Sequence, residues 1–393
     1  MTERIQILRE RGNGRVLCNL AAGCDMNSID AYLIRTHPDA MAAGLKQLYE
    51  QANANELLIY APVGMDVSAL LAALADINVA TTYGPASPVL REESALYAAI
   101  ASGEIRSDPE GYALRRAYEE EGFDGRPTLI VDGETAYFGS QSPRATKFIR
   151  IRNSDPIEVP IGISLEQLLQ AQNLPFGKGL LLGGNLGYFV AEESLAETII
   201  SQDRLFDSID LFSDADCMAD ALDTLLAFSR EQSCQRCVLC REGTYQLSAI
   251  FSAVVGGKGT RDSLPLVEDI SPLISAGALC SFGRNMVGPA LSGVTQFKQE
   301  LDSHIIKKTC PAGKCAAFAK YVIDPIKCTG CGDCLDACEY DAIDGKSGFI
   351  HVIDNSMCEK CDACRKVCPE EAILINASQV RTPVKPIRVG TFR

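Results

Sequence analysis

Most of the seventeen cysteines in this chain of 393 residues stand in three closely spaced runs. Two runs near the C-terminus, CTGCGDCLDAC and CEKCDACRKVCP, both follow the spacing C-x2-C-x2-C-x3-C. A third run, SCQRCVLCREGT, repeats the two-residue spacing with three cysteines. Three thiolates at this spacing can hold one face of a cubane iron–sulfur cluster, whereas zinc sites rarely take four cysteines from so tight a run. The runs therefore predict iron–sulfur chemistry.

The paired C-terminal runs resemble those of bacterial two-cluster ferredoxins, in which the fourth cysteine of each run binds the other cluster. This resemblance implies two [4Fe–4S] clusters with crossed ligands. One would be held by Cys328, Cys331, Cys334 and Cys368, and the other by Cys358, Cys361, Cys364 and Cys338.

The third run needs a fourth ligand, and the segment GALCSFG offers Cys280. Apolar residues recur at helical spacing in DCMADALDTLLAFSREQS, YQLSAIFSAVV and SLPLVEDISPLISA. This periodicity predicts a helical bundle that folds Cys280 back onto the run. The expected ligands of this third [4Fe–4S] cluster are Cys234, Cys237, Cys240 and Cys280.

Five cysteines remain outside these groups. Cys18 lies in an apolar strand pattern and is expected to be a buried thiol, and Cys24 has no assigned role. The other three share the junction between bundle and ferredoxin runs with a histidine, and three thiolates with one imidazole form a standard tetrahedral zinc set. The alternatives are a fourth iron–sulfur cluster, a Cys310–Cys315 disulfide and unliganded thiols. The predicted ligands of a redox-inert zinc are Cys217, His304, Cys310 and Cys315.

The bulk composition argues against several functions. The net charge of −14 disfavours nucleic-acid binding, and no stretch approaches the roughly 18 apolar residues of a membrane span. The N-terminus lacks the apolar core of a signal peptide, so we expect a cytoplasmic protein. The basic segment 377–393 is expected to be an extended tail, either solvated or docked on a partner. His37 and His351 are expected to be surface or satisfied core residues.

The segment SCQRCVLCREGT, followed by ALCSFG, resembles the iron–sulfur region of the flavin-binding subunit of NADH:quinone oxidoreductase (complex I). With the ferredoxin runs added, the chain is most similar to the beta subunit of NAD-linked, electron-bifurcating iron-only hydrogenases. Those subunits share a cysteine in D-x-x-C-M-x-D and a downstream H-x5-C-x-A-x2-C, which there bind zinc. The resemblance implies an N-terminal α/β domain that binds FMN and NADH, followed by a small β-grasp (SLBB-like) domain.

The residues that contact flavin and nucleotide in that family are largely replaced here. The family's glycine-rich run, G-R-G-G-x-G-F-P-T-G, does not occur, and LAAGC stands where acidic residues contact the nicotinamide nucleotide. Asn19, Glu92 and Glu93 match family positions, but Asp132 and Gly133 replace the paired asparagines that hold the flavin ring. Core packing and ligand binding place separate demands on a sequence, so a fold can outlast its site. We therefore expect a degenerate domain without FMN or NADH.

The predicted fold class is α/β + α. In chain order we expect a degenerate FMN/NADH-type α/β domain (1–146), a β-grasp domain (147–198), a helical [4Fe–4S] domain (199–303), a zinc junction (304–322), a two-cluster ferredoxin domain (323–376) and the basic C-terminal tail (377–393).

This order predicts an electron-transfer subunit of a hetero-oligomeric oxidoreductase. Its three [4Fe–4S] clusters would connect a flavoprotein or ferredoxin partner with a catalytic subunit of the hydrogenase or formate dehydrogenase type. The alternatives are an FMN-containing NAD(P)H:acceptor reductase subunit, and an iron–sulfur sensor or assembly scaffold. No direct membrane insertion is expected.

Overall fold

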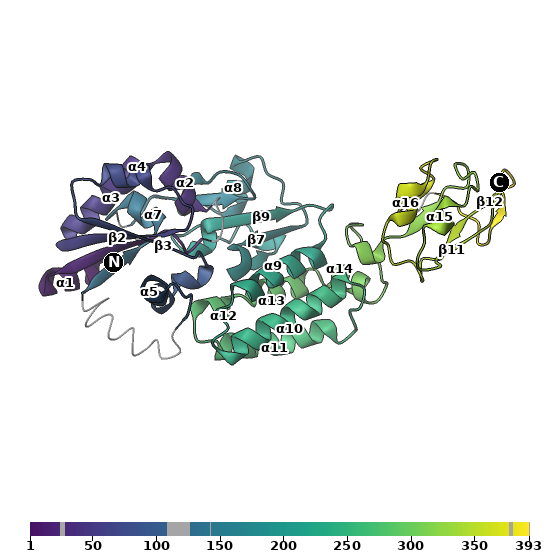
Figure 1. Cartoon of the computed structure of the whole chain (residues 1–393). Coiled ribbons are helices and arrows are strands. Elements are labelled where there is room, and N and C mark those ends of the chain that lie inside the picture. The colour runs from purple at the N-terminus through teal and green to yellow at the C-terminus, as the bar shows by residue number, and fades with distance from the viewer. Residues whose placement is uncertain (24–27, 108–125, 142, 377–379, 393) are drawn as a thin grey trace. The chain divides into compact units, whose positions relative to one another are not determined.

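The computed structural model describes the chain except for residues 24–27, 108–125, 142, 377–379 and 393 (Figure 1). The chain forms two units. The first comprises Met1–Asp214, Ala221–Phe251 and Asp262–Lys298, and the second comprises Ala215–Asp220, Ser252–Arg261 and Gln299–Arg393.

The first unit begins with a parallel sheet whose side chains face two different cores. The strand order is β3-β2-β1-β4. Side chains alternate along each strand, so Val16 and Cys18 of β1 face one core and Leu17 faces the other. The strands are β1 (Gly14–Asn19), β2 (Ala54–Pro62), β3 (Val79–Gly84) and β4 (Thr128–Val131).

Helices cover both faces of this sheet, as a parallel sheet requires. One face is covered by α1 (Thr2–Arg11), α2 (Ile29–Thr36), α3 (Pro38–Gln51), α4 (Ser68–Ala73) and α7 (Gly133–Phe138). The other face packs against η1 (Pro88–Arg91), α5 (Glu93–Ser102) and the cysteine-bearing segments around residues 240 and 280. The sheet thereby forms a wall beside the predicted helical cluster.

A five-stranded mixed sheet follows, where the β-grasp domain is expected. The order is β6-β5-β9-β7-β8. Its helix α8 (Leu165–Ala171) starts with a capping box, in which Ser164 and Gln167 each bond the other's backbone N–H. The predicted boundary at residue 198 is too early, because β9 inserts between β5 and β7. The strands are β5 (Thr146–Ile151), β6 (Ile157–Pro160), β7 (Gly179–Leu182), β8 (Tyr188–Val190) and β9 (Ser208–Phe212).

Six helices follow at the positions where the apolar periodicity predicts a bundle. Close packing depends on small residues. A Cβ at Gly293, for example, would lie 2.8 Å from the side chain of Leu222. No helix among the described residues is long and apolar enough to cross a membrane. The helices are α9 (Met218–Gln232), α10 (Val238–Val255), α11 (Ser263–Gly277), α12 (Ser281–Asn285), α13 (Gly288–Gln296) and α14 (Lys298–Ile305).

The ferredoxin part of the second unit is built from short strand pairs and two short helices. The pairs are β10 (Tyr321–Ile323) with β14 (Ile373–Ile375), β11 (Ile343–Asp344) with β13 (Val352–Ile353), and β12 (Phe349–Ile350) with β15 (Ile387–Arg388). The helices are α15 (Asp333–Asp336) and α16 (Ala363–Val367).

The basic C-terminal segment is not a free tail throughout. Strand β15 pairs antiparallel with β12, with Ile387 opposite Ile350. Ile387 and Phe392 also pack against the apolar core of the ferredoxin part. The prediction of a wholly extended tail over 377–393 is therefore wrong for these residues, because their apolar side chains complete a core.

Candidate metal centres

The four residues predicted to bind zinc come together within the second unit. Their ligand atoms all lie within 4.8 Å of one another. The Sγ atom of Cys217 is 3.2 Å from His304 Nε2 and 3.4 Å from Cys315 Sγ, and Cys310 completes the group. Metal–ligand bonds of about 2.0–2.3 Å in a tetrahedral zinc site separate the ligand atoms by roughly 3.5 Å. The group therefore has the dimensions of a single-ion site.

The hydrogen bonds of His304 orient its ring toward the thiols. His304 is fully buried in the last turn of α14, and its Nδ1 lies 2.9 Å from the carbonyl oxygen of Glu300. When Nδ1–H donates to this carbonyl, Nε2 faces the thiols, as in metal-bound histidines. Burial disfavours the imidazolium, but bonds with Cys217 and Glu300 raise the pKa of His304 to about 9. A hydrogen bond from Cys315 lowers the pKa of Cys217 to about 3.

The four cysteines predicted for the helical cluster lie together in the first unit, against the second face of the parallel sheet. Cys240 lies in the first turn of α10, and Cys280 is the N-cap of α12. Burial, together with the neighbouring thiols, raises the pKa of Cys240 to about 12. A bound metal ion would lower these raised thiol pKa values, because it stabilises the thiolates that coordinate it. Cys234 and Cys237 precede α10 and belong to the same cluster of residues.

The eight ferredoxin cysteines line two separate cavities. Burial and the neighbouring thiols raise the pKa of Cys334, in one cavity, to about 12, and that of Cys364, in the other, to about 11. The fourth cysteine of each run lies with the first three of the other run, as crossed cluster ligands require. One cavity is lined by Cys328, Cys331, Cys334 and Cys368, and the other by Cys338, Cys358, Cys361 and Cys364.

His351 also lines the first of these cavities, which the sequence pattern alone did not indicate. Its side chain is 1% exposed, and its Nδ1 lies 4.0 Å from Cys328 Sγ. No described residue hydrogen-bonds its Nε2. Of the two predicted alternatives, His351 is therefore a core residue, but only one of its ring nitrogens has a partner among the described residues. The apolar residues on both sides of His351 in FIHVI are the signal that points to burial.

The remaining singled-out residues have no metal-binding partners among the described residues. His37 is half-buried beside Tyr137, and its Nδ1 lies 2.6 Å from Thr36 Oγ1. Cys18 is fully buried in β1, as predicted. Cys24 lies outside the described residues.

The positions that match flavin contacts in the family are occupied by internal bonds. The Asn19 amide donates to the carbonyl of Leu90 (2.9 Å), and its oxygen accepts from the backbone N–H of Ala21 (3.1 Å). The Asn19 side chain therefore holds the loop after β1 against the helical turn η1. Both ends of its amide are used within the protein.

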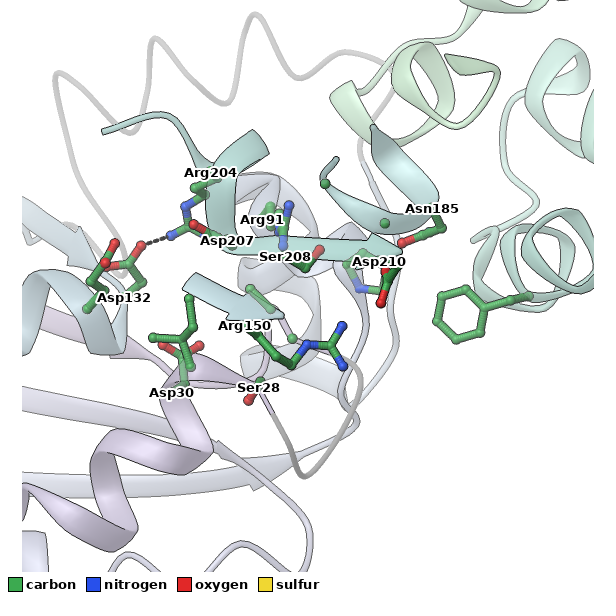
Figure 2. A pocket seen from close by; sticks show the side chains of 18 of the residues that line it. Ser28, Asp30, Arg91, Asp132, Arg150, Asn185, Arg204, Asp207, Ser208 and Asp210 are labelled. Carbon is green, nitrogen blue, oxygen red and sulfur yellow. Dashed lines mark hydrogen bonds and ion pairs between the residues drawn. The ribbon is translucent and has the colours of Figure 1, made fainter. Parts of the chain in front are cut away.

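Asp132 and Gly133 form hydrogen bonds and an ion pair with neighbouring protein residues. Asp132 caps α7 by accepting from Thr135 N–H (2.7 Å) and forms an ion pair with Arg204 (Figure 2). The N–H of Gly133 donates to Asp30 Oδ1 at 2.9 Å. A Cβ on residue 133 would lie 2.4 Å from that oxygen. An asparagine at 133 is therefore incompatible with Asp30 in its present place.

The cavity beside these residues is small and rich in carboxylates. Its volume is about 260 Å³, below the roughly 300–1,000 Å³ of typical ligand pockets. Burial and the charge of Asp132 raise the pKa of Asp30 to about 7, whereas Arg204 outweighs burial and lowers the pKa of Asp132 to about 2. An FMN phosphate in this cavity would meet more acidic than basic groups, so the lining does not fit that phosphate. The charged lining consists of Asp30, Asp132, Glu134, Asp207, Asp210, Arg91, Arg150 and Arg204.

Two segments match known protein families. Residues 220–304 match the NADH-ubiquinone oxidoreductase-F iron-sulfur binding region, and residues 327–372 match the 4Fe-4S dicluster domain. These matches cover the bundle with its cysteine group and the two ferredoxin cavities.

Similar proteins come from hydrogenases and NADH-quinone oxidoreductases. The chain is 31% identical over 307 residues to the NADP-reducing hydrogenase subunit HndC of Solidesulfovibrio fructosivorans, which covers 70% of this chain and 62% of the relative. It is 23% identical over 291 residues to the NADH-quinone oxidoreductase F subunit of Streptomyces coelicolor, with coverages of 66% and 61%. A chain of an NAD+-reducing [NiFe]-hydrogenase in the H2-reduced state has the same fold, with a TM-score of 0.65 at 19% identity over 77% of this chain and 59% of that one.

These matches define an iron–sulfur protein whose relatives are subunits of oxidoreductases. The chain carries the iron–sulfur binding region of NADH-ubiquinone oxidoreductase F subunits and resembles these subunits beyond it. It spans about three fifths of the length of the relatives described above.

Proposed function

We propose that this chain is an iron–sulfur electron-transfer subunit of a multi-subunit oxidoreductase. The observation that carries the proposal is the sorting of twelve cysteines into three groups of four. Each group is gathered at its own place in the structure, although its members are separated in the sequence. Each group would hold one [4Fe–4S] cluster, and each cluster can pass one electron at a time.

The protein residues around each group would determine how readily its cluster accepts an electron. Burial, hydrogen bonds to sulfur and nearby charge are the quantities through which proteins adjust cluster potentials. The helical group lies against the apolar face of the sheet, whereas Cys331 and Cys361 of the ferredoxin groups are exposed. The ferredoxin clusters are thus the more accessible ones for electron exchange with a partner.

The fourth metal centre would be a structural zinc at Cys217, His304, Cys310 and Cys315. Zinc is redox-inert, and four protein ligands leave no open coordination position for catalysis. It would connect the start of α9, the end of α14 and the segment before the ferredoxin strands, all within the second unit.

FMN has no place in this proposal. Asn19, Asp132 and Gly133 are engaged with protein groups at the positions that match flavin contacts, and the adjacent cavity is acidic. The flavin of the complex would then belong to another subunit. Partners would be a catalytic subunit, of the hydrogenase type by analogy with two of the relatives or of the formate dehydrogenase type, and a flavoprotein or ferredoxin. The complex would work in the reducing cytoplasm, where thiols stay free to bind metal.

Metal and flavin analysis of the intact complex tests the proposal. The complex is purified without oxygen, and iron, sulfide, zinc and flavin are measured per copy of this chain. We expect about twelve irons and one zinc, with no flavin released when this subunit is isolated under native conditions. FMN bound to this subunit in stoichiometric amount, or iron for fewer than three clusters, contradicts it.

A further inference from the structure

The ferredoxin part is an internal repeat whose two cavities correspond residue by residue. Shifting the sequence by thirty positions superimposes YVIDPIKC, which ends at Cys328, on HVIDNSMC, which ends at Cys358. Under the same shift, every residue that lines the first cavity has its counterpart in the lining of the second. Differences between the two cavities can therefore be identified one position at a time.

The main buried difference is His351 in the first cavity against Tyr321 in the second. Both side chains are buried and line the cavity formed mainly by the other half's cysteines. The Tyr321 hydroxyl donates to Asp362 Oδ1 at 3.1 Å, so its proton is directed to a carboxylate. His351 instead places Nδ1 at 4.0 Å from the sulfur of Cys328, within the longer reach of hydrogen bonds to sulfur.

The protonation of His351 follows from its surroundings. A cluster ligand is a thiolate without a proton, so in this contact Nδ1–H is the donor and Cys328 Sγ is the acceptor. No described residue bonds Nε2, and a bare acceptor nitrogen costs less than an N–H left without an acceptor. The proton therefore resides on Nδ1 and faces Cys328. The ring has little freedom to turn, because a Cβ on Gly345 would lie 2.0 Å from its Cδ2.

Charged groups elsewhere at the two cavities do not take the place of the N–H that His351 directs at Cys328. At the second cavity the acids Glu359 and Asp362 are balanced by nearby bases. Lys360 bonds the carbonyl of Cys358 at 2.9 Å, and Arg365 lies 3.6 Å from Asp362. At the first cavity Glu370 is exposed, so solvent screens it.

We propose that His351 is a positioning residue for electron transfer, which raises the potential of the cluster bound by Cys328, Cys331, Cys334 and Cys368 above that of its neighbour. Reduction adds one electron to the cluster, and the added negative charge is shared with its cysteine sulfurs. An N–H aimed at Cys328 Sγ stabilises the reduced form more than the oxidised form. The proton stays on His351 throughout. The electron that enters the ferredoxin part therefore resides preferentially at this cluster.

The inference rests on the proposed function, because it needs both ferredoxin clusters. The experiment is an anaerobic redox titration of the intact complex followed by electron paramagnetic resonance, with iron and sulfide measured on every sample. In His351→Phe, we expect one midpoint potential to shift downward while the other potentials keep their wild-type values. The matched control is Tyr321→Phe, which removes the hydroxyl bonded to Asp362 and is expected to leave the potential of the first cluster unchanged.

The outcomes distinguish a failure of the proposed function from a failure of the role of His351. Wild-type complex without the two ferredoxin clusters overturns the proposed function. Wild-type complex with these clusters, and His351→Phe with unchanged potentials, overturns the role of His351 alone. If His351→Phe loses iron, His351→Tyr replaces it, since the repeat already accommodates tyrosine at the corresponding position. Loss of iron in both variants shows a purely structural residue and also overturns the inference.

Discussion

The Nε2 atom of His304 lies 3.2 Å from the sulfur of Cys217, although 87 residues separate the two in the sequence. The contact joins the end of α14 to the residue before α9. Cys315 lies within 3.5 Å of both atoms. Three donor atoms at these separations match the edges of a tetrahedral zinc site, in which the cation offsets the repulsion between thiolates.

Cys310→Ser is therefore expected to remove zinc while leaving the iron content almost unchanged. Serine is a poor zinc ligand, and a three-ligand site binds more weakly than a closed one. Elemental analysis of the purified complex measures both metals. Cys18→Ala serves as the control, since Cys18 is buried away from all metal groups. An iron loss of about four atoms per chain would show that Cys310 binds a cluster instead.

Cys280→Ala should lower the iron content from about twelve to about eight per chain. Cys280 is the ligand supplied by the distant segment of the helical group, and its loss leaves the cluster open on one side. The control is Ser233→Ala, which removes a hydroxyl 3.4 Å from Cys240 Sγ without removing a ligand. Unchanged iron in Cys280→Ala would refute the assignment of this fourth ligand.

Asp30→Asn should stabilise the protein at pH 8 more than at pH 4. The folded-state pKa of Asp30 is about 7 because of burial and the charge of Asp132, above the unfolded value of about 3.9. The folded state therefore binds more protons, and the free energy of unfolding falls as pH rises through this window. Asparagine keeps the oxygen that accepts from Gly133 and carries no charge. The expected gain at pH 8 is on the order of 4 kcal/mol.

Chemical denaturation at both pH values measures this gain. The matched control is Asp155→Asn, because Asp155 is exposed and pairs with Arg35 on the surface. Such pairs contribute about 0–1 kcal/mol. Equal effects of Asp30→Asn at pH 4 and pH 8 would contradict the raised pKa.

Gly133→Asn, which introduces the asparagine that the sequence resemblance leads one to expect at this position, should destabilise the fold by about 1–3 kcal/mol. The new Cβ would lie 2.4 Å from Asp30 Oδ1. The double variant Asp30→Ala with Gly133→Asn removes the clash and should recover part of the loss. Thermal unfolding of both variants and of Asp30→Ala completes the cycle. Additive effects would show that the two residues do not oppose each other.

The grouping of the cysteines and His304 was predictable from sequence, because residue type and short spacing indicate which side chains could share a metal. The four zinc candidates illustrate this, since only cysteine and histidine were needed to find them. The bond between Asp30 and Gly133 was not predictable, because 103 residues separate its partners and only the parallel sheet brings them together. Strand β15 was missed for a related reason: the prolines around it indicate an extended tail, and its pairing with β12 is a tertiary contact.

The crossed arrangement of the ferredoxin cysteines has a consequence for biosynthesis. During translation, Cys334 leaves the ribosome well before Cys368, yet both line the same cavity. The other cavity likewise combines Cys338 with Cys358 to Cys364. Neither cavity is complete until almost the whole repeat has been synthesised. A nascent chain that ends within the repeat therefore has no finished place for either cluster, and iron–sulfur delivery to this part must follow the synthesis of the whole repeat.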